Sequence, residues 1–240
     1  MTQKVSDLFQ CGGAAGLVPN DILTGNIIGL EYSYSTASQI GVGKGTCYDS
    51  LNATKIVKNG DTTVDLIEAN IASWAVDGSA VLINTIYNIF VIEGGGIKFD
   101  TDVEGANIAE KKRWIGFVLT DDTGSGGIIE FKQSGDSLTF TTVDGVLINS
   151  GITSTSFVEY SLLSLLPTVR CETIGYTTKH TSNQRVIIFS LDGVDEILVG
   201  EVSGISVWGS LLYLSATPSV WLKVEESTGS VKISAVTLKR

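Results

Sequence analysis

Cysteine, proline and histidine are scarce in this chain. Its 240 residues include 3 Cys, 3 Pro and 1 His. The cysteines Cys11, Cys47 and Cys171 are odd in number, far apart and without Cys-x-x-Cys spacing, so the sequence predicts neither a disulfide framework nor a zinc site. We interpret each as a small apolar side chain. His180 lies in the polar run Thr177–Asn183 and is interpreted as a solvated loop residue, which leaves histidine-based chemistry with one poor candidate.

Long apolar runs are also missing. The longest candidates, such as Ile86–Ile92, have strand length and fall short of the roughly 20 residues that a membrane helix needs. The N-terminal residues MTQKVSDLFQ lack the apolar core and small-residue cleavage site of a secretory signal. We therefore expect no membrane insertion, and a chain that is made and kept in a reducing cytoplasm.

Positive charge is in deficit. The chain has 16 Lys and Arg against 26 Asp and Glu, a formal net charge of −10. A surface of that sign repels phosphate backbones, so no nucleic-acid partner is expected. The one basic cluster is Lys111 to Arg113, beside Trp114. We interpret it as solvating the entrance to a strand, with the anchoring of a partner as the alternative.

What the chain does have is a succession of short apolar runs divided by turn residues. With 43% hydrophobic residues and 27 Gly, it has the composition of a folded globular protein. Runs of strand length separated by Gly, Asn and Asp predict an all-β fold. We predict two β-sandwich or jelly-roll-like modules, with at most one short helix. The expected divisions are a docking arm over residues 1–20, an N-terminal β module over 21–143 and a C-terminal β-sandwich over 144–240.

Nine strands are expected in the N-terminal module. They are Ile27–Tyr34, Gln39–Tyr48, Thr54–Val57, Thr62–Asp65, Asn84–Ile92, Ile97–Phe99, Trp114–Leu119, Ile128–Lys132 and Leu138–Thr142. Asn59-Gly60-Asp61 is the strongest hairpin signal. The spacing of apolar residues over Ile67–Trp74 predicts a short helix. The triplet Gly94–Gly96 predicts a turn and not a phosphate site, because no Lys-Ser/Thr pair follows. Gly124–Gly127 is likewise expected to be a hairpin loop, between Trp114–Leu119 and Ile128–Lys132.

Eight further strands are expected beyond Val143. They are Val146–Asn149, Ser156–Leu163, Thr168–Thr177, Arg185–Ser190, Ile197–Glu201, Ser210–Ser215, Val220–Val224 and Val231–Leu238. That number of strands at short intervals is typical of a β-sandwich or jelly roll. In the last strand, regular alternation places Val231, Ile233, Ala235 and Thr237 on one face. It places Lys232, Ser234, Val236 and Leu238 on the other, which suits the centre of a sheet or an oligomer face.

Motifs for catalysis or metal binding are weak. Asp100, Asp102, Glu104 and Gly105 reproduce the opening of a calcium loop, but its closing position is Lys111 and no helix follows, so we interpret the segment as a solvated acidic turn. No serine lies in a Gly-x-Ser-x-Gly elbow, and no pair of carboxylates stands out for glycoside cleavage. The sequence predicts no enzyme activity, no cofactor and no metal.

Four tryptophans supply the one candidate for ligand binding. Trp74 and Trp114 fall on apolar faces and are expected in the core. Trp208 and Trp221, with Tyr213 near them, lie among Gly, Ser and Pro. Aromatic rings at such margins can stack on sugar rings. Trp208, Tyr213 and Trp221 are therefore the candidate ligand-binding residues, with core packing as the alternative.

Several segments occur in an order seen in a common family of tailed-bacteriophage virion proteins. They are DLFQCGG at Asp7–Gly13, NDILTGNIIGL at Asn20–Leu30, GKGTCYDS at Gly43–Ser50, ASWAVDG at Ala72–Gly78, NTIYNIFVI at Asn84–Ile92, KRWIGFVLTDDTG at Lys112–Gly124 and FKQSGDSLTF at Phe131–Phe140. Through these small matches the chain resembles a phage tail, fibre or appendage component, and the likeness weakens after Thr142. No functional residue is carried over, because the family is defined by architecture and place in the virion.

The resemblance implies a structural virion subunit that docks to other virion proteins and is assembled in the host cytoplasm. A homo-oligomer is expected, with a trimer favoured. The alternative function is a receptor- or carbohydrate-binding module of a phage adhesion device, with a host-surface glycan as partner. The two hypotheses differ at Trp208 and Trp221, whose loss should abolish binding only under the alternative.

Overall fold

The structure is a computed structural model that describes residues 27–72, 81–122, 126–140, 146–163, 165–167, 170–180, 185–190, 197–202, 207–208, 212–213, 219–224 and 229–239. Over these residues the chain is all-β and every ladder between its named strands is antiparallel, which confirms the predicted fold class. A jelly-roll strand order stays a prediction. The docking arm expected over residues 1–20 lies outside the described residues. No helix among the described residues is long and apolar enough to cross a membrane.

Two small sheets begin the N-terminal module. One has the order β1 (Ile27–Gly29), β4 (Gly45–Tyr48), β5 (Lys55–Lys58), and the other β2 (Tyr32–Thr36), β3 (Gln39–Val42), β6 (Thr62–Asp65). Two expected long strands are thus each broken in two. The break falls where Leu30 has a φ of 57° and where Gly43 and Lys44 separate β3 from β4. Hydrogen bonds from Leu30 N to Lys44 O and from Gly43 N to Glu31 O keep the chain paired across it.

The hairpin predicted at Asn59–Asp61 is wrong. β5 pairs with β4 and β6 pairs with β3, so this turn carries the chain from one sheet to the other. Its polar groups bond outside a hairpin pattern: the Lys58 amine donates to the Gly60 carbonyl, and Asp61 Oδ1 accepts from the Lys44 amide. The chain does bend at Gly60, but β5 and β6 take partners in two different sheets.

A third sheet closes over the core in the order β8 (Ile97–Asp100), β7 (Ile86–Ile92), β9 (Lys112–Leu119). The predicted turn at Gly94–Gly96 is confirmed, because β7 pairs with β8 and Gly94 and Gly95 have φ of 89° and 81°. β9 begins at Lys112, so the basic cluster does lie at a strand entrance. Trp114 is buried as expected, with 3% of its surface exposed.

The helix predicted over Ile67–Trp74 shrinks to the single 3₁₀ turn η2 (Glu68–Asn70) in the described residues, and residues 73–80 lie outside them. The apolar spacing has another cause. Ile71 is buried and forms a parallel bridge with Phe99, and the Ala72 amide donates to the Phe99 carbonyl. Ile67, on the same supposed face, is 47% exposed. Pairing with the edge of β8 therefore takes the place of helical bonds.

The loop after β9 turns the chain back but does not make a full hairpin. Thr120 and Ile128 form an isolated bridge, Asp121 N donates to Gly127 O, and residues 123–125 lie outside the described part. β9 takes β7 as its ladder partner. The following strand, β10 (Phe131–Ser134), pairs with β11 (Ser137–Phe140) instead.

The C-terminal module is sandwich-like and contains two sheets. A seven-stranded sheet joins β10 and β11 to β12 (Val146–Ile152), β14 (Cys171–His180), β17 (Val207–Trp208), β18 (Leu212–Tyr213) and β20 (Gly229–Leu238). A four-stranded sheet has the order β13 (Val158–Ser161), β19 (Ser219–Val224), β15 (Arg185–Ser190), β16 (Ile197–Val202). Each of the eight expected strands is found, and β17 is additional. His180 ends β14 opposite Gly229, so its placement on a loop is wrong.

The final strand, β20, is central as predicted, since it pairs with β11, β12 and β14. Its predicted alternation is wrong after Ile233. Val231 and Ile233 are buried, but so are Ser234, Val236 and Leu238. The register against β14 shifts at this point, because Gly175 pairs with Ala235 and Tyr176 with Ile233, which leaves Ser234 as a bulge residue. Because one extra residue is inserted, the apolar side chains that follow it point to the opposite face from the one that strict alternation predicts.

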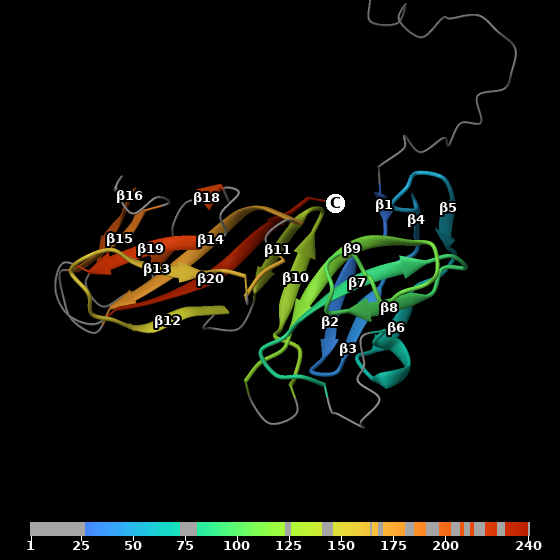
Figure 1. Ribbon diagram of the computed structural model, residues 1–240, viewed down its shortest axis with the longest axis horizontal. Coiled ribbons are helices and arrows are strands. Elements are labelled where there is room, and N and C mark those ends of the chain that lie inside the picture. Colours follow the sequence, from blue (N-terminus) through green and yellow to red (C-terminus); the bar gives the residue numbers. More distant parts are fainter. Residues whose placement is uncertain are drawn as a thin grey trace, which may run out of the picture.

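The two modules share a sheet across the predicted boundary near residue 143. Residues Ser137–Thr139 of β11 pair with Ala235–Thr237 of β20, and Figure 1 shows β10 and β11 between the N-terminal sheets and the C-terminal strands. A side-chain contact adds to this joint. Arg170 lies over the Trp114 ring at 5.6 Å and donates to Glu104 at 2.8 Å. The modules are therefore joined by backbone pairing as well as by side chains.

Candidate ligand groove

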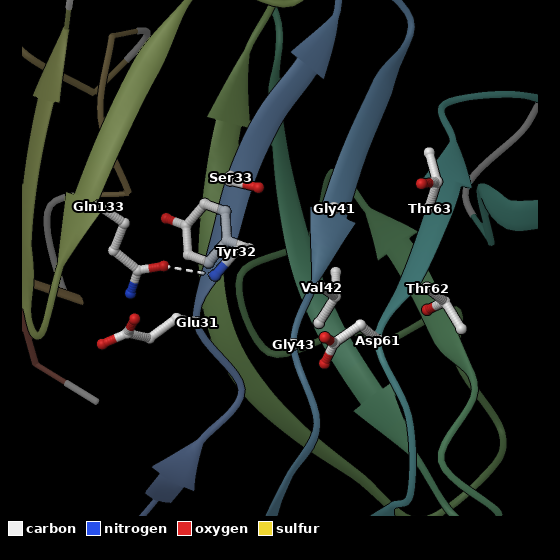
Figure 2. Close-up of a pocket in the computed structure, with 10 residues that line it drawn as sticks. All are labelled: Glu31, Tyr32, Ser33, Gly41, Val42, Gly43, Asp61, Thr62, Thr63 and Gln133. Atoms are coloured by element: carbon white, nitrogen blue, oxygen red, sulfur yellow. Dashed lines mark hydrogen bonds between the residues drawn. The ribbon is translucent and has the colours of Figure 1, made fainter.

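A groove of about 410 Å³ lies on the outer face of the sheet β2-β3-β6 (Figure 2). Two rows of residues build it. Ser33, Gly41 and Thr63 pair across the three strands and form the first row. Strand alternation places the residues two positions away on the same face, so Glu31 and Asp61 flank Gly43 in the second row. The hydrogen bond from Gly43 N to Glu31 O continues the register there.

The floor of the groove is made of glycine, because Gly41 in β3 and Gly43 just after it have no side chain on the outer face. A Cβ atom at Gly41 would lie 2.9 Å from Ser33 Oγ, and one at Gly43 would lie 3.3 Å from Glu31 O. Neither glycine has a positive φ. Close approach of the neighbouring strand, and not backbone strain, is therefore what a side chain at these positions would meet.

The walls carry one hydroxyl and one carboxylate on each side. Ser33 and Glu31 stand on β2 and the segment before it, and Thr63 and Asp61 stand on β6 and the segment before it. All four are exposed, whereas the inward Tyr32 on β2 is buried and the inward Val64 on β6 is half-buried. Asp61 is fixed in place, because its Oδ1 accepts a hydrogen bond of 2.8 Å from the Lys44 amide. The groove is thus open to solvent and lined by groups that both donate and accept.

A glutamine holds the β2 side of the groove. Gln133 Oε1 accepts from the Tyr32 amide at 2.7 Å, and its Nε2 donates to the Gly135 carbonyl at 2.9 Å. Figure 2 shows Gln133 and Glu31 on one side of the groove and Asp61 with Thr62 on the other. The bond to Tyr32 satisfies a backbone donor at the free edge of β2, so this wall is anchored to the neighbouring hairpin.

The inner face of the same sheet is packed tightly. The Tyr32 ring lies 5.2 Å from the Phe131 ring, and its hydroxyl accepts a hydrogen bond from the Phe117 amide. At the end of β5, in the neighbouring sheet, burial lowers the pKa of Lys58, and the charge of Asp61 acts in the opposite direction. Groove residues therefore stand on a rigid support, which favours a preformed site.

The groove offers hydrogen-bonding groups on both of its walls. In the part of the chain that the structure describes, no three His, Cys, Asp or Glu side chains gather to hold a metal ion. Its lining has no Cys, His or Lys that could act as a nucleophile. Hydroxyls and carboxylates on both walls can instead hydrogen-bond a polar ligand that lies over the glycine floor.

The three residues predicted to stack on sugars lie in two different sheets. Trp208 in β17 pairs with Thr177, and Tyr213 in β18 pairs with Thr173, so both flank β14 in the seven-stranded sheet. Trp221 lies in β19 of the four-stranded sheet and is half-buried. The predicted platform therefore draws on strands of both sheets.

The calcium-like loop uses its carboxylates on its own backbone. Asp100 is fully buried and accepts from the Asp102 amide, from the Asn107 amide and from Asn107 Nδ2. Asp102 Oδ1 accepts from the Glu104 and Ala106 amides. Glu104 points to Arg170 at 2.8 Å. These bonds make the segment an internally braced turn that supports the joint between the modules.

Sequence reasoning missed the groove, although one signal for it was present. Gly41 and Gly43 are two residues apart around Val42. In a strand, that spacing places both glycines on the same face, and a strand between two partners would leave that face bare. Only the sheet order shows that β3 is the central strand.

Comparisons with known proteins add no relative: the chain matches no protein-family model, no curated protein and no solved structure. Its function must therefore be argued from its own residues.

Proposed function

We propose that this chain is a non-catalytic structural subunit of a bacteriophage virion, a tail, fibre or appendage component that acts by protein–protein assembly. The observation that carries the proposal is the pairing of β11 with β20. It makes two all-β modules continuous through one sheet, as suits a subunit that projects from a particle and transmits force. The segments resembling phage virion proteins supply the second support.

Self-association is part of this proposal, with a trimer favoured. Ile28, Thr46 and Val57 pair across β1, β4 and β5 and form one row on the sheet. Ile28 is 57% exposed and Val57 is 40% exposed. An exposed row of β-branched side chains on a sheet face is a surface that contact with a second copy would bury. We assign this row to the contact between copies.

Light scattering of the full chain over a range of concentrations tests the assembly. A trimer whose mass does not depend on concentration is expected, because obligate subunits bury large apolar faces. Val57→Lys should reduce the mass toward that of a monomer. Ile67→Lys is the matched control, since Ile67 is 47% exposed and lies away from this row. A monomer at every concentration would contradict self-association.

The place in a virion needs a separate test. An antibody raised against the purified chain should label intact phage particles from the phage that encodes it, and the chain should be found among the proteins of washed particles by mass spectrometry. Its absence from such particles would contradict a virion role, whatever its oligomeric state.

A further inference from the structure

The two rows that line the groove on β2-β3-β6 present a balanced set of donors and acceptors. Within the described residues, no hydrogen bond occupies the hydroxyl of Ser33 or Thr63. Each hydroxyl can donate once and accept twice, and the carboxylates of Glu31 and Asp61 accept. A matching ligand must therefore donate and accept along both of its edges. We propose that this groove binds a neutral saccharide.

The shape of the groove suits a sugar ring. Gly41 and Gly43 add no side chain of their own to the floor, so a ring can lie over this segment with its hydroxyls toward the two walls, where Ser33 Oγ already reaches toward Gly41. The volume of about 410 Å³ is within the usual range for small-molecule sites. The walls come from two different strands held in register by β3, so their separation is fixed before a ligand arrives.

Charge decides between ligand classes. Two carboxylates and no basic side chain line the groove, so an anion such as a phosphate is repelled. Lys58 lies close enough to Asp61 for their opposite charges to interact, and its buried amine donates to the Gly60 carbonyl. Because the charge of Lys58 acts on Asp61 and the Lys44 amide donates to it, the groove attracts a cation less strongly than two unopposed carboxylates would. Hydroxyl groups satisfy the remaining acceptors without a charge.

Saccharide binding by this groove goes beyond the structural function proposed above and does not depend on it. It is also separate from the predicted platform at Trp208, Tyr213 and Trp221, which lies on C-terminal strands. A subunit that assembles can lack a sugar site, and a sugar-binding module can be a monomer. The experiment below therefore measures binding alone.

Titration of the ¹⁵N-labelled full chain with three sugars tests the proposal. The probes are the methyl β-glycosides of glucose, galactose and N-acetylglucosamine, each added to about 10 mM and expected to bind with Kd on the order of 1 mM, as an open site implies. The amides of Gly41 and Gly43 report on the floor. At least one of the sugars should shift these two amides in a saturable manner.

Two variants remove one hydroxyl each and keep the shape of the strand. Ser33→Ala and Thr63→Val should each weaken the binding roughly fivefold, the usual effect of one lost hydrogen bond. Ser137→Ala is the matched control: Ser137 is an exposed strand serine outside the groove, and its loss should leave Kd unchanged.

Three results would overturn the proposal. The first is that none of the three sugars shifts Gly41 or Gly43. The second is a shift that Ser33→Ala and Thr63→Val leave as strong as in the unaltered chain. The third is saturable binding of spermidine at the same amides without binding of any sugar, which would make the groove a cation site. The mass measured by light scattering decides the assembly proposal separately from each of them.

Discussion

Replacing Gly116 with Ala should strongly destabilise the N-terminal module. A Cβ atom there would lie 2.3 Å from Cε1 of Tyr32, whereas carbon atoms normally approach to about 3.5 Å, so the ring must move by about 1 Å. Tyr32 is 2% exposed and packs on Phe131, which leaves it no space. Overpacking costs about 2 kcal/mol, and loss of the bond from the Phe117 amide to the Tyr32 hydroxyl adds about 1 kcal/mol. The free energy of unfolding should fall by about 3 kcal/mol.

Urea denaturation followed by tryptophan fluorescence measures this change, since Trp114 lies in the same strand as Gly116. Gly60→Ala is the control, because nothing lies within 4 Å of a Cβ atom at Gly60, and it should change the stability by less than about 1 kcal/mol. Tyr32→Leu removes the clashing ring, so Gly116→Ala should cost less in that background. A loss below about 1 kcal/mol for Gly116→Ala alone would refute the reasoning.

Four further predictions concern the C-terminal module and its joint. Arg170→Met should lower the free energy of unfolding by about 1 kcal/mol in urea, because it removes the cation over Trp114, and unchanged stability would contradict that contribution. Burial raises the pKa of Cys171 to about 12, so at pH 8 only about one thiol in ten thousand is ionised and iodoacetamide should label the peptide only after unfolding; rapid labelling of the native protein would argue against burial. The same shift should lower stability as the pH rises above about 9. Trp208→Ala with Trp221→Ala should leave binding to host cells unchanged in a purely structural subunit, and lost binding would favour the receptor alternative.

Much of the strand pattern could be predicted from sequence because it depends on local chemistry. β6 and β15 have the predicted bounds, and the Gly94–Gly96 turn joins β7 to β8. Two of the errors share one origin. Asn59–Asp61 has the residues of a hairpin turn, and Ile67–Trp74 has the spacing of a helix, but a strand partner elsewhere in the chain competed for each segment. The propensities of neighbouring residues cannot predict which distant strand will pair with a segment.

The candidate sites show the same limit. The residues of the calcium-like motif were found in sequence, yet their carboxylates are used by amides of the same loop. The groove could not be predicted from the sequence, because its wall and floor residues come from three strands and the segments beside them. They lie up to 32 positions apart, from Glu31 to Thr63. A lone Gly-Val-Gly segment gives no indication of which side chains will stand beside it.

The sequence by itself determined that this protein is all-β and roughly where most of its strands lie, since these follow from the period of apolar residues and from backbone sterics. The tertiary structure alone decided which strands pair, where the bulge at Ser234 reverses the buried face of β20, and how β11 joins the two modules. The physical reason is that every strand offers the same backbone N–H and C=O groups, so hydrogen bonding alone does not select which strand pairs with which. The choice among them is made by the packing of side chains such as Tyr32 against Gly116, which only the folded chain brings together.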